Sequence, residues 1–133
     1  MNLTSRIIIA FVGLNGAIAT ILAALASHSV IMSNNEYLSS VFVKANNMHF
    51  YHLIALLAVA ILYQVASHRV WLFSGVMFAL GIILFSGSLY LFSFSGAKIA
   101  GFLTPLGGVC FIVGWSALLL GALMNTKKIS RDS

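Results

Sequence analysis

FLTPLGGVCFIVGWSALLLGALM, residues 102–124, runs for 23 residues without a charged side chain. A transmembrane helix needs about 20 predominantly apolar residues. Three other windows, residues 7–26, 50–67 and 70–94, are equally free of charge. Backbone groups in lipid must find partners within their own segment, which favours helices, and the sequence lacks the short alternating strands of a barrel. It therefore predicts an all-α, integral membrane four-helix bundle.

The overall composition supports a membrane protein. Apolar residues make up 61% of the chain and charged residues only 7%, whereas about 25% is usual for a soluble domain. The net charge of +5 is scattered between the apolar runs, so it does not form the basic face of a nucleic-acid binder. We expect one transmembrane domain over residues 1–124 and a basic cytoplasmic tail over residues 125–133.

The distribution of positive charge predicts the orientation. With four spans, the amino terminus, the second gap and the tail share one side of the membrane. That side holds five cations: Arg6, Arg69, Lys127, Lys128 and Arg131. The other side holds Lys44 and Lys98. Short loops rich in Lys and Arg stay inside, so both termini are expected in the cytoplasm of a multi-pass inner-membrane protein.

The first span has a signal peptide as its alternative interpretation. Arg6 precedes the apolar run, and Ala24-Leu25-Ala26 resembles a cleavage site. The run is about 20 residues long, whereas the apolar core of a signal peptide has about 7–15. We therefore expect this segment to remain as a membrane span.

The long first gap is expected to contain an amphipathic helical segment between the first two spans. Ser33 and Glu36 have the spacing of a capping box, and apolar residues between 37 and 48 recur at helical intervals. This segment could lie in the outer interface, run into the second span or simply cover the bundle. At the fourth span, Thr104 and Pro105 predict a helix start, with Thr as the N-cap.

Small residues form stripes on two spans. Gly107, Gly114 and Gly121 repeat every seven residues, as a helix-packing seam requires. The first span has a comparable stripe of Gly13, Gly16, Thr20, Ala24 and Ser27. The two stripes suggest either that the first and fourth helices pack together or that one stripe forms a dimer. Asn15 and Trp115 are expected to bridge helices.

Polar side chains in the spans are candidate functional groups, because such groups are costly in lipid. Under the four-span topology, several of them reach the outer half of the bundle. This candidate outer-side polar cluster comprises His28, His52, Ser86, Tyr90 and Thr104.

Metal, haem and catalytic sites have weak support. His49 and His52 share a helical face, but His28 is the only obvious third ligand and Glu36 is the only carboxylate in that loop. Nothing beyond two histidines favours haem. The chain lacks paired carboxylates, a P-loop, and a nucleophile elbow around Ser88. We expect no metal, no cofactor and no catalytic residue.

Several motifs together resemble a family of small bacterial inner-membrane proteins, domain of unknown function 423, whose animal relative is transmembrane protein 256. The resemblance covers about residues 7–124. It rests on the motifs Ala26-Ser27-His28, Tyr51-His52-x-x-Ala55-Leu56-Leu57, Phe85-Ser86-Gly87-Ser88-Leu89-Tyr90, Thr104-Pro105-x-Gly107-Gly108 and Gly114-Trp115. Ser27 replaces the usual Ala, Ala23 and Ala24 replace glycines, and His49 matches no family position. The resemblance implies a four-helix inner-membrane protein and emphasises the same outer polar residues. It implies no reaction or ligand.

Three functions remain open on this basis. The first is a non-enzymatic structural or accessory component that acts through helix contacts, as a homo-oligomer or within a larger membrane complex. The second is a bundle that binds a small ligand or lipid through the outer polar cluster. The third is metal or haem binding. The lipid bilayer is the only certain partner, and nucleic acid is not expected.

Overall fold

The computed structural model describes residues 1–129, with side chains described as far as residue 124, and every regular element in this part is helical. Four helical segments there are long and apolar enough to cross a membrane, which confirms the predicted fold class. They are α1 (Leu3–Ser27), α3 (Glu36–Val65), the continuous run of α4 (Arg69–Gly81), η1 (Ile82–Ser86) and α5 (Gly87–Ser95), and α6 (Ala100–Ile129). The helix α6 thus extends into the predicted tail, of which residues 130–133 lie outside the described part.

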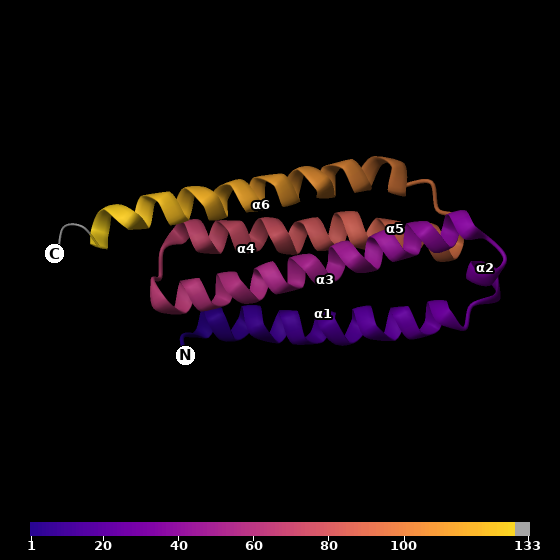
Figure 1. Ribbon diagram of the computed structural model, residues 1–133, viewed down its shortest axis with the longest axis horizontal. Coiled ribbons are helices and arrows are strands. Elements are labelled where there is room, and N and C mark those ends of the chain that lie inside the picture. The colour runs from indigo at the N-terminus through magenta and orange to yellow at the C-terminus, as the bar shows by residue number, and fades with distance from the viewer. Residues whose placement is uncertain (130–133) are drawn as a thin grey trace.

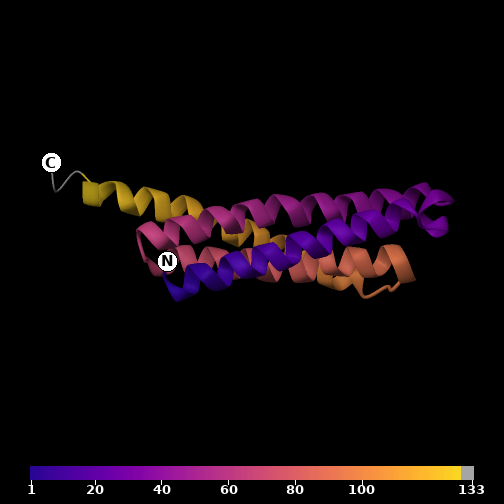
Figure 2. The ribbon, with the colours of Figure 1, turned by 90° about the horizontal axis from the view of Figure 1, so that it is seen from below.

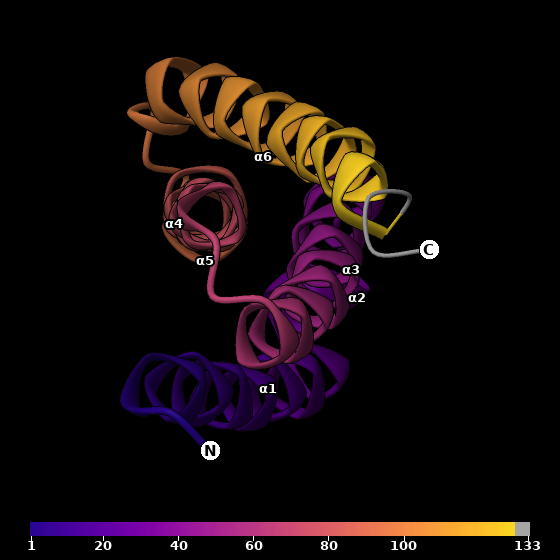
Figure 3. The same cartoon turned by 90° about the vertical axis from the view of Figure 1, so that its left-hand side faces the viewer.

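The spans form an open array. Figure 1 shows the start of α1 and the end of α6 at the same end of the molecule, as an even number of crossings requires. Viewed end-on, α1 and α6 lie on opposite sides, with α3 and the α4–α5 run between them (Figure 3). The helix α1 runs obliquely across the others (Figure 2) and packs mainly against α3.

The first gap differs from the predicted capping box. Ser33 ends the short helix α2 (Val30–Ser33), and the N-cap of α3 is Asn35, whose side chain accepts a hydrogen bond from Leu38 N at 3.1 Å. The predicted amphipathic segment runs directly into the second span. Residues 36–65 contain neither Gly nor Pro, so no residue interrupts the helix between the outer segment and the apolar core.

The expected start of the last helix at Thr104 is also wrong. The chain reverses at Gly96, where φ is +69°, and α6 already begins at Ala100. The Lys98 carbonyl accepts from Gly101 N at 3.1 Å, so a turn before the helix supplies the first backbone partners. Pro105 therefore lies one turn inside α6, and the hydroxyl of Thr104 is engaged with Ser88 at 2.7 Å instead of capping the helix.

The third span contains a π-helical turn that the sequence did not predict. Gly87 N donates to the carbonyl of Ile82, five residues earlier, which widens the helix over η1. The backbone of Phe85 in this turn lies against Gly107 of α6, where an added Cβ would come within 2.3 Å of Phe85 N. Only glycine at this position leaves room for the wider turn.

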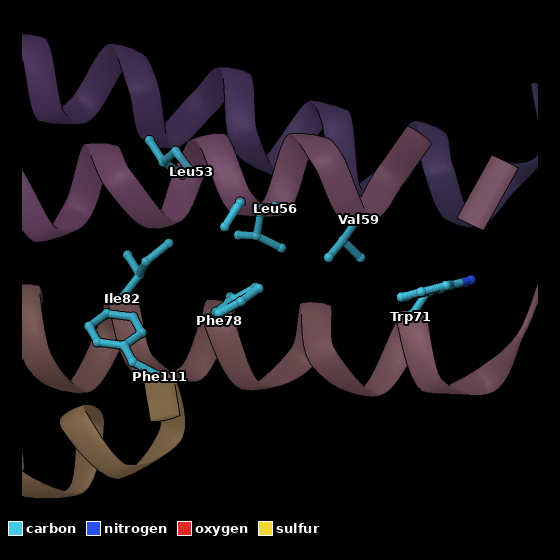
Figure 4. Packing of buried hydrophobic residues seen from close by; sticks show 8 residues of the cluster. Leu53, Leu56, Val59, Trp71, Phe78, Ile82 and Phe111 are labelled. Atoms are coloured by element: carbon cyan, nitrogen blue, oxygen red, sulfur yellow. The ribbon is translucent and has the colours of Figure 1, made fainter. Parts of the chain in front are cut away.

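The core lies between α3, α4, η1 and α6. Figure 4 shows Leu53, Leu56 and Val59 of α3 facing Trp71, Phe78 and Ile82, with Phe111 of α6 beside them. Lipid tails are as apolar as these side chains, so close packing, more than exclusion of water, holds the helices together.

Each glycine of the α6 seam faces an aromatic residue of the third span. A Cβ on Gly114 would lie 2.7 Å from the Phe78 ring, and one on Gly121 would lie 2.6 Å from the Trp71 ring. The helix-packing seam therefore faces α4 and η1. It does not face the small-residue stripe of α1, so the suggested packing of the first and fourth helices through their two stripes is not what the structure contains.

Candidate functional site

The residues of the candidate outer-side polar cluster separate into different contacts. His28 is exposed at the C-cap of α1. Tyr90 faces α3 within the core, and His52 contacts α6. Thr104 pairs with Ser88, while the buried Ser86 hydroxyl has no hydrogen-bond partner among the described residues. Within the described part of the chain, no hydrogen bond joins any two of the five residues.

Tyr90 is part of a buried hydrogen-bond network with Asn46 and His49. Nδ2 of Asn46 donates to Tyr90 Oη at 2.9 Å and to the Ala19 carbonyl at 3.0 Å. Nδ1 of His49 lies 3.2 Å from Tyr90 Oη. These three side chains connect α1, α3 and α5, and we refer to them as the tyrosine network.

The donors in the tyrosine network can be assigned by chemistry. The amide nitrogen of Asn46 only donates, so Tyr90 Oη accepts from it and is free to donate its own proton to His49 Nδ1. A neutral His49 then carries its ring proton on Nε2. That nitrogen is buried and has no hydrogen-bond partner among the described residues.

His52 forms a side-chain contact between α3 and α6. Its Nδ1 lies 2.7 Å from the Met48 carbonyl, and Trp115 Nε1 donates to its Nε2 at 3.1 Å. The carbonyl can only accept and the indole can only donate, so both ring nitrogens are satisfied by a neutral imidazole protonated at Nδ1. The ring also stacks on Phe111, with centroids 3.5 Å apart.

Three further side-chain bonds join neighbouring helices. Ser5 Oγ of α1 donates to the Ala60 carbonyl of α3 at 3.0 Å. Ser74 Oγ of α4 donates to the Gly114 carbonyl of α6 at 2.8 Å. The hydroxyls of Ser88 and Thr104 pair between α5 and α6. Polar side chains thus occur at each main contact between adjacent spans, which is how polar groups usually act in membrane bundles.

The two histidines of the H-x-x-H motif face different partners. His49 bonds to Tyr90 of α5, whereas His52 bonds to Trp115 of α6. Within the described residues, no group of three or more His, Cys, Asp or Glu side chains is placed to hold a metal ion.

Sequence reasoning missed Asn46 as a polar contact and took His49 only as a weak metal ligand. Both lie in the amphipathic helical segment predicted before the second span, so they were not counted among the polar groups of the spans. Trp115 bridges helices as expected, but Asn15 does not, because its Nδ2 donates to the Phe11 carbonyl of its own helix at 3.0 Å. Trp71, Phe78 and Phe85 are spaced by seven residues, like the three glycines of the seam. This shared spacing could have identified them as the aromatic partners of the glycines.

Comparisons with known proteins identify relatives of this chain. A family model described as "Protein of unknown function (DUF423)" matches residues 22–108. The UPF0382 inner membrane protein YgdD of Escherichia coli (strain K12) is 32% identical over 127 residues, covering 95% of this chain and 96% of that protein. The UPF0382 membrane protein SSP2132 of Staphylococcus saprophyticus is 36% identical over 117 residues, covering 87% and 96%. No solved structure matches the chain significantly.

Proposed function

This chain belongs to the DUF423 family, and from that premise we propose that it is a non-enzymatic multi-pass inner-membrane protein that acts as a small structural or accessory component through helix–helix contacts. The contacts are made by α1, which associates with α1 of a second copy. The observation that carries this proposal is the position of α1 at the edge of the array.

The helix α1 has far fewer internal contacts than the other spans. Only 6% of its apolar window is buried inside the molecule, against 28–39% for the other three windows. At Gly13 and Gly16 an added Cβ would meet no atom of the described residues within 4 Å, so no neighbouring side chain in this part fills the space beside these glycines. Thr20 and Ala24 continue the stripe and are exposed. Small residues spaced in this way allow two helix backbones to approach closely in lipid.

The use of the polar side chains supports a structural role over a catalytic one. Ser5, Ser74 and His52 each bond across a helix contact, and no acidic residue occurs in any of the four predicted windows. Side chains engaged in this way hold helices in place and are not free to act on a substrate. The alternative of a ligand site in the outer polar cluster loses support, because its five residues make separate contacts.

Cysteine cross-linking in native membranes tests the association. In a Cys110→Ser background, Thr20→Cys is expected to give disulfide-linked dimers on mild oxidation, because a disulfide needs Cβ atoms about 3.5–4.5 Å apart. Ile54→Cys, on the exposed face of α3, is the matched control and is expected to stay monomeric. The proposal fails if Thr20→Cys and Ala24→Cys both give no dimer, or if Ile54→Cys links equally well.

A further inference from the structure

A groove lies between α3, α5 and α6 at the end of the molecule away from the termini. It has a volume of about 420 Å³ and is separate from the tyrosine network and from the stripe of α1. Figure 1 shows the start of α3, the end of α5 and the start of α6 together at this end. The groove is large enough for part of a lipid-sized molecule.

The interior of the groove is apolar. Val41 of α3, Leu89 and Phe92 of α5 and Pro105 of α6 form much of its lining. Tyr37 closes one side, with its ring edge-on to Phe92 at a centroid separation of 6.2 Å. The polar hydroxyl of Thr104 is already paired with Ser88. These walls suit a hydrocarbon chain better than a soluble polar ligand.

Among the described residues, Lys98 is the only charged one that lines the groove. It lies in the turn between α5 and α6, at the polar end of two spans, and its side chain is exposed. Glu36, next to Tyr37, does not line the groove. A single positive charge beside an apolar channel at a helix end complements a molecule with an anionic head and an apolar tail.

We propose that this groove binds a phospholipid with an anionic headgroup. The phosphate lies beside the Lys98 ammonium group, and one acyl chain follows Leu89, Val41 and Pro105 along the groove between the helices. The occupant is a lipid and not free phosphate, because most of the lining offers hydrocarbon and only one cation is present. This binding site is distinct from the helix contact of α1 and does not depend on it.

Native mass spectrometry of the purified full-length chain tests the proposal. The probe is an equal mixture of phosphatidylglycerol and phosphatidylcholine with identical acyl chains in a mild detergent. The wild-type chain is expected to retain phosphatidylglycerol about fivefold more than phosphatidylcholine, the effect of one lysine near an anionic headgroup. Lys98→Gln is expected to remove this preference.

Two further variants separate a built site from general charge attraction. Lys44→Gln removes the same charge at the same end of the bundle but outside the groove, and it is expected to keep the preference. Gly101→Leu puts a side chain into the groove, where an added Cβ meets no atom within 4 Å, and is expected to lower retention of both lipids while Lys98 remains. Equal effects of Lys98→Gln and Lys44→Gln, no preference in the wild type, or full retention by Gly101→Leu would each overturn the proposal.

Discussion

At the scale of single residues, Tyr90 and Asn46 together link three helices of the bundle. The Tyr90 hydroxyl contacts Asn46 and His49, and Asn46 also reaches the Ala19 carbonyl of α1. The Tyr90 ring packs on Phe42 with centroids 5.4 Å apart. The Tyr90 hydroxyl thus links α5 to α3 by hydrogen bonds, and Asn46 extends this link to α1.

Tyr90→Phe is expected to lower the free energy of unfolding by about 1–2 kcal/mol, because hydrogen bonds between membrane helices average about 0.6 kcal/mol each and the variant loses two. Unfolding in mixed detergent micelles measures the change. Tyr51→Phe is the control, because Tyr51 is 60% exposed. Equal stability of Tyr90→Phe and Tyr51→Phe would show that the tyrosine network does not hold the helices.

The sequence predicted the polar residues better than their partners. Tyr90 and His52 were recognised because a polar group in an apolar window stands out. Identifying their partners Asn46 and Trp115 requires knowing which helices are neighbours and how far each is shifted along the membrane normal. The hydropathy of a single helix contains neither piece of information. His28 was grouped with them by the predicted topology and by the family resemblance, although the end of α1 lies at the edge of the array.

At the scale of elements, the contact between α6 and the third span depends on a repeat in both partners. Rings at Trp71, Phe78 and Phe85 advance by seven residues, while the glycines that face them step back by seven along α6. An antiparallel pair of helices requires this arrangement, and each ring occupies the space that a missing Cβ leaves. The π-helical turn at η1 brings the Phe85 backbone, as well as its side chain, against Gly107.

Gly114→Leu is expected to destabilise the chain by about 3 kcal/mol or more, because the new side chain must displace the fully buried ring of Phe78. Thermal unfolding in detergent without added lipid provides the measurement. Gly101→Leu makes the same exchange where an added Cβ meets nothing, and its melting temperature should match the wild type. If both variants melt with the wild type, the glycine seam is not a packing contact.

The windows of apolar residues located the helices but not all of their ends. The apolar window predicts that the second span starts near residue 50, whereas α3 starts at Glu36. The helix continues beyond its apolar part because no Gly or Pro interrupts it. The π-helical turn could not be predicted, since a single extra residue in a helical turn leaves the apolar pattern almost unchanged.

At the scale of the whole molecule, α1 and α6 are the two outer helices, and α1 is the less buried of them. Composition was enough to predict the four crossings, because lipid permits few backbone structures. It could not rank the possible helix neighbours, since any two apolar helices can lie side by side. The order α1, α3, α4–α5, α6 across the molecule (Figure 3) follows from the particular glycine, aromatic and hydrogen-bond contacts.

The charge distribution predicts that both termini face the cytoplasm, with five cations on their side of the membrane and two on the other. A fluorescent protein fused after Ser133 is expected to fluoresce, and alkaline phosphatase at the same position is expected to be inactive. In a Cys110→Ser chain, Asn34→Cys should react with an impermeant thiol reagent in whole cells. An active phosphatase fusion, or a position 34 that is labelled only after lysis, would reverse the orientation.

The proposed role of α1 is tested most directly by the oligomeric state of Gly13→Leu in mild detergent, measured by native mass spectrometry. A Cβ added at Gly13 would meet no atom of the described residues within 4 Å, so the account predicts an unchanged melting temperature and a shift from the wild-type dimer to monomer. A wild-type chain that is monomeric in several mild detergents, or a Gly13→Leu variant that remains as dimeric as the wild type, would contradict it.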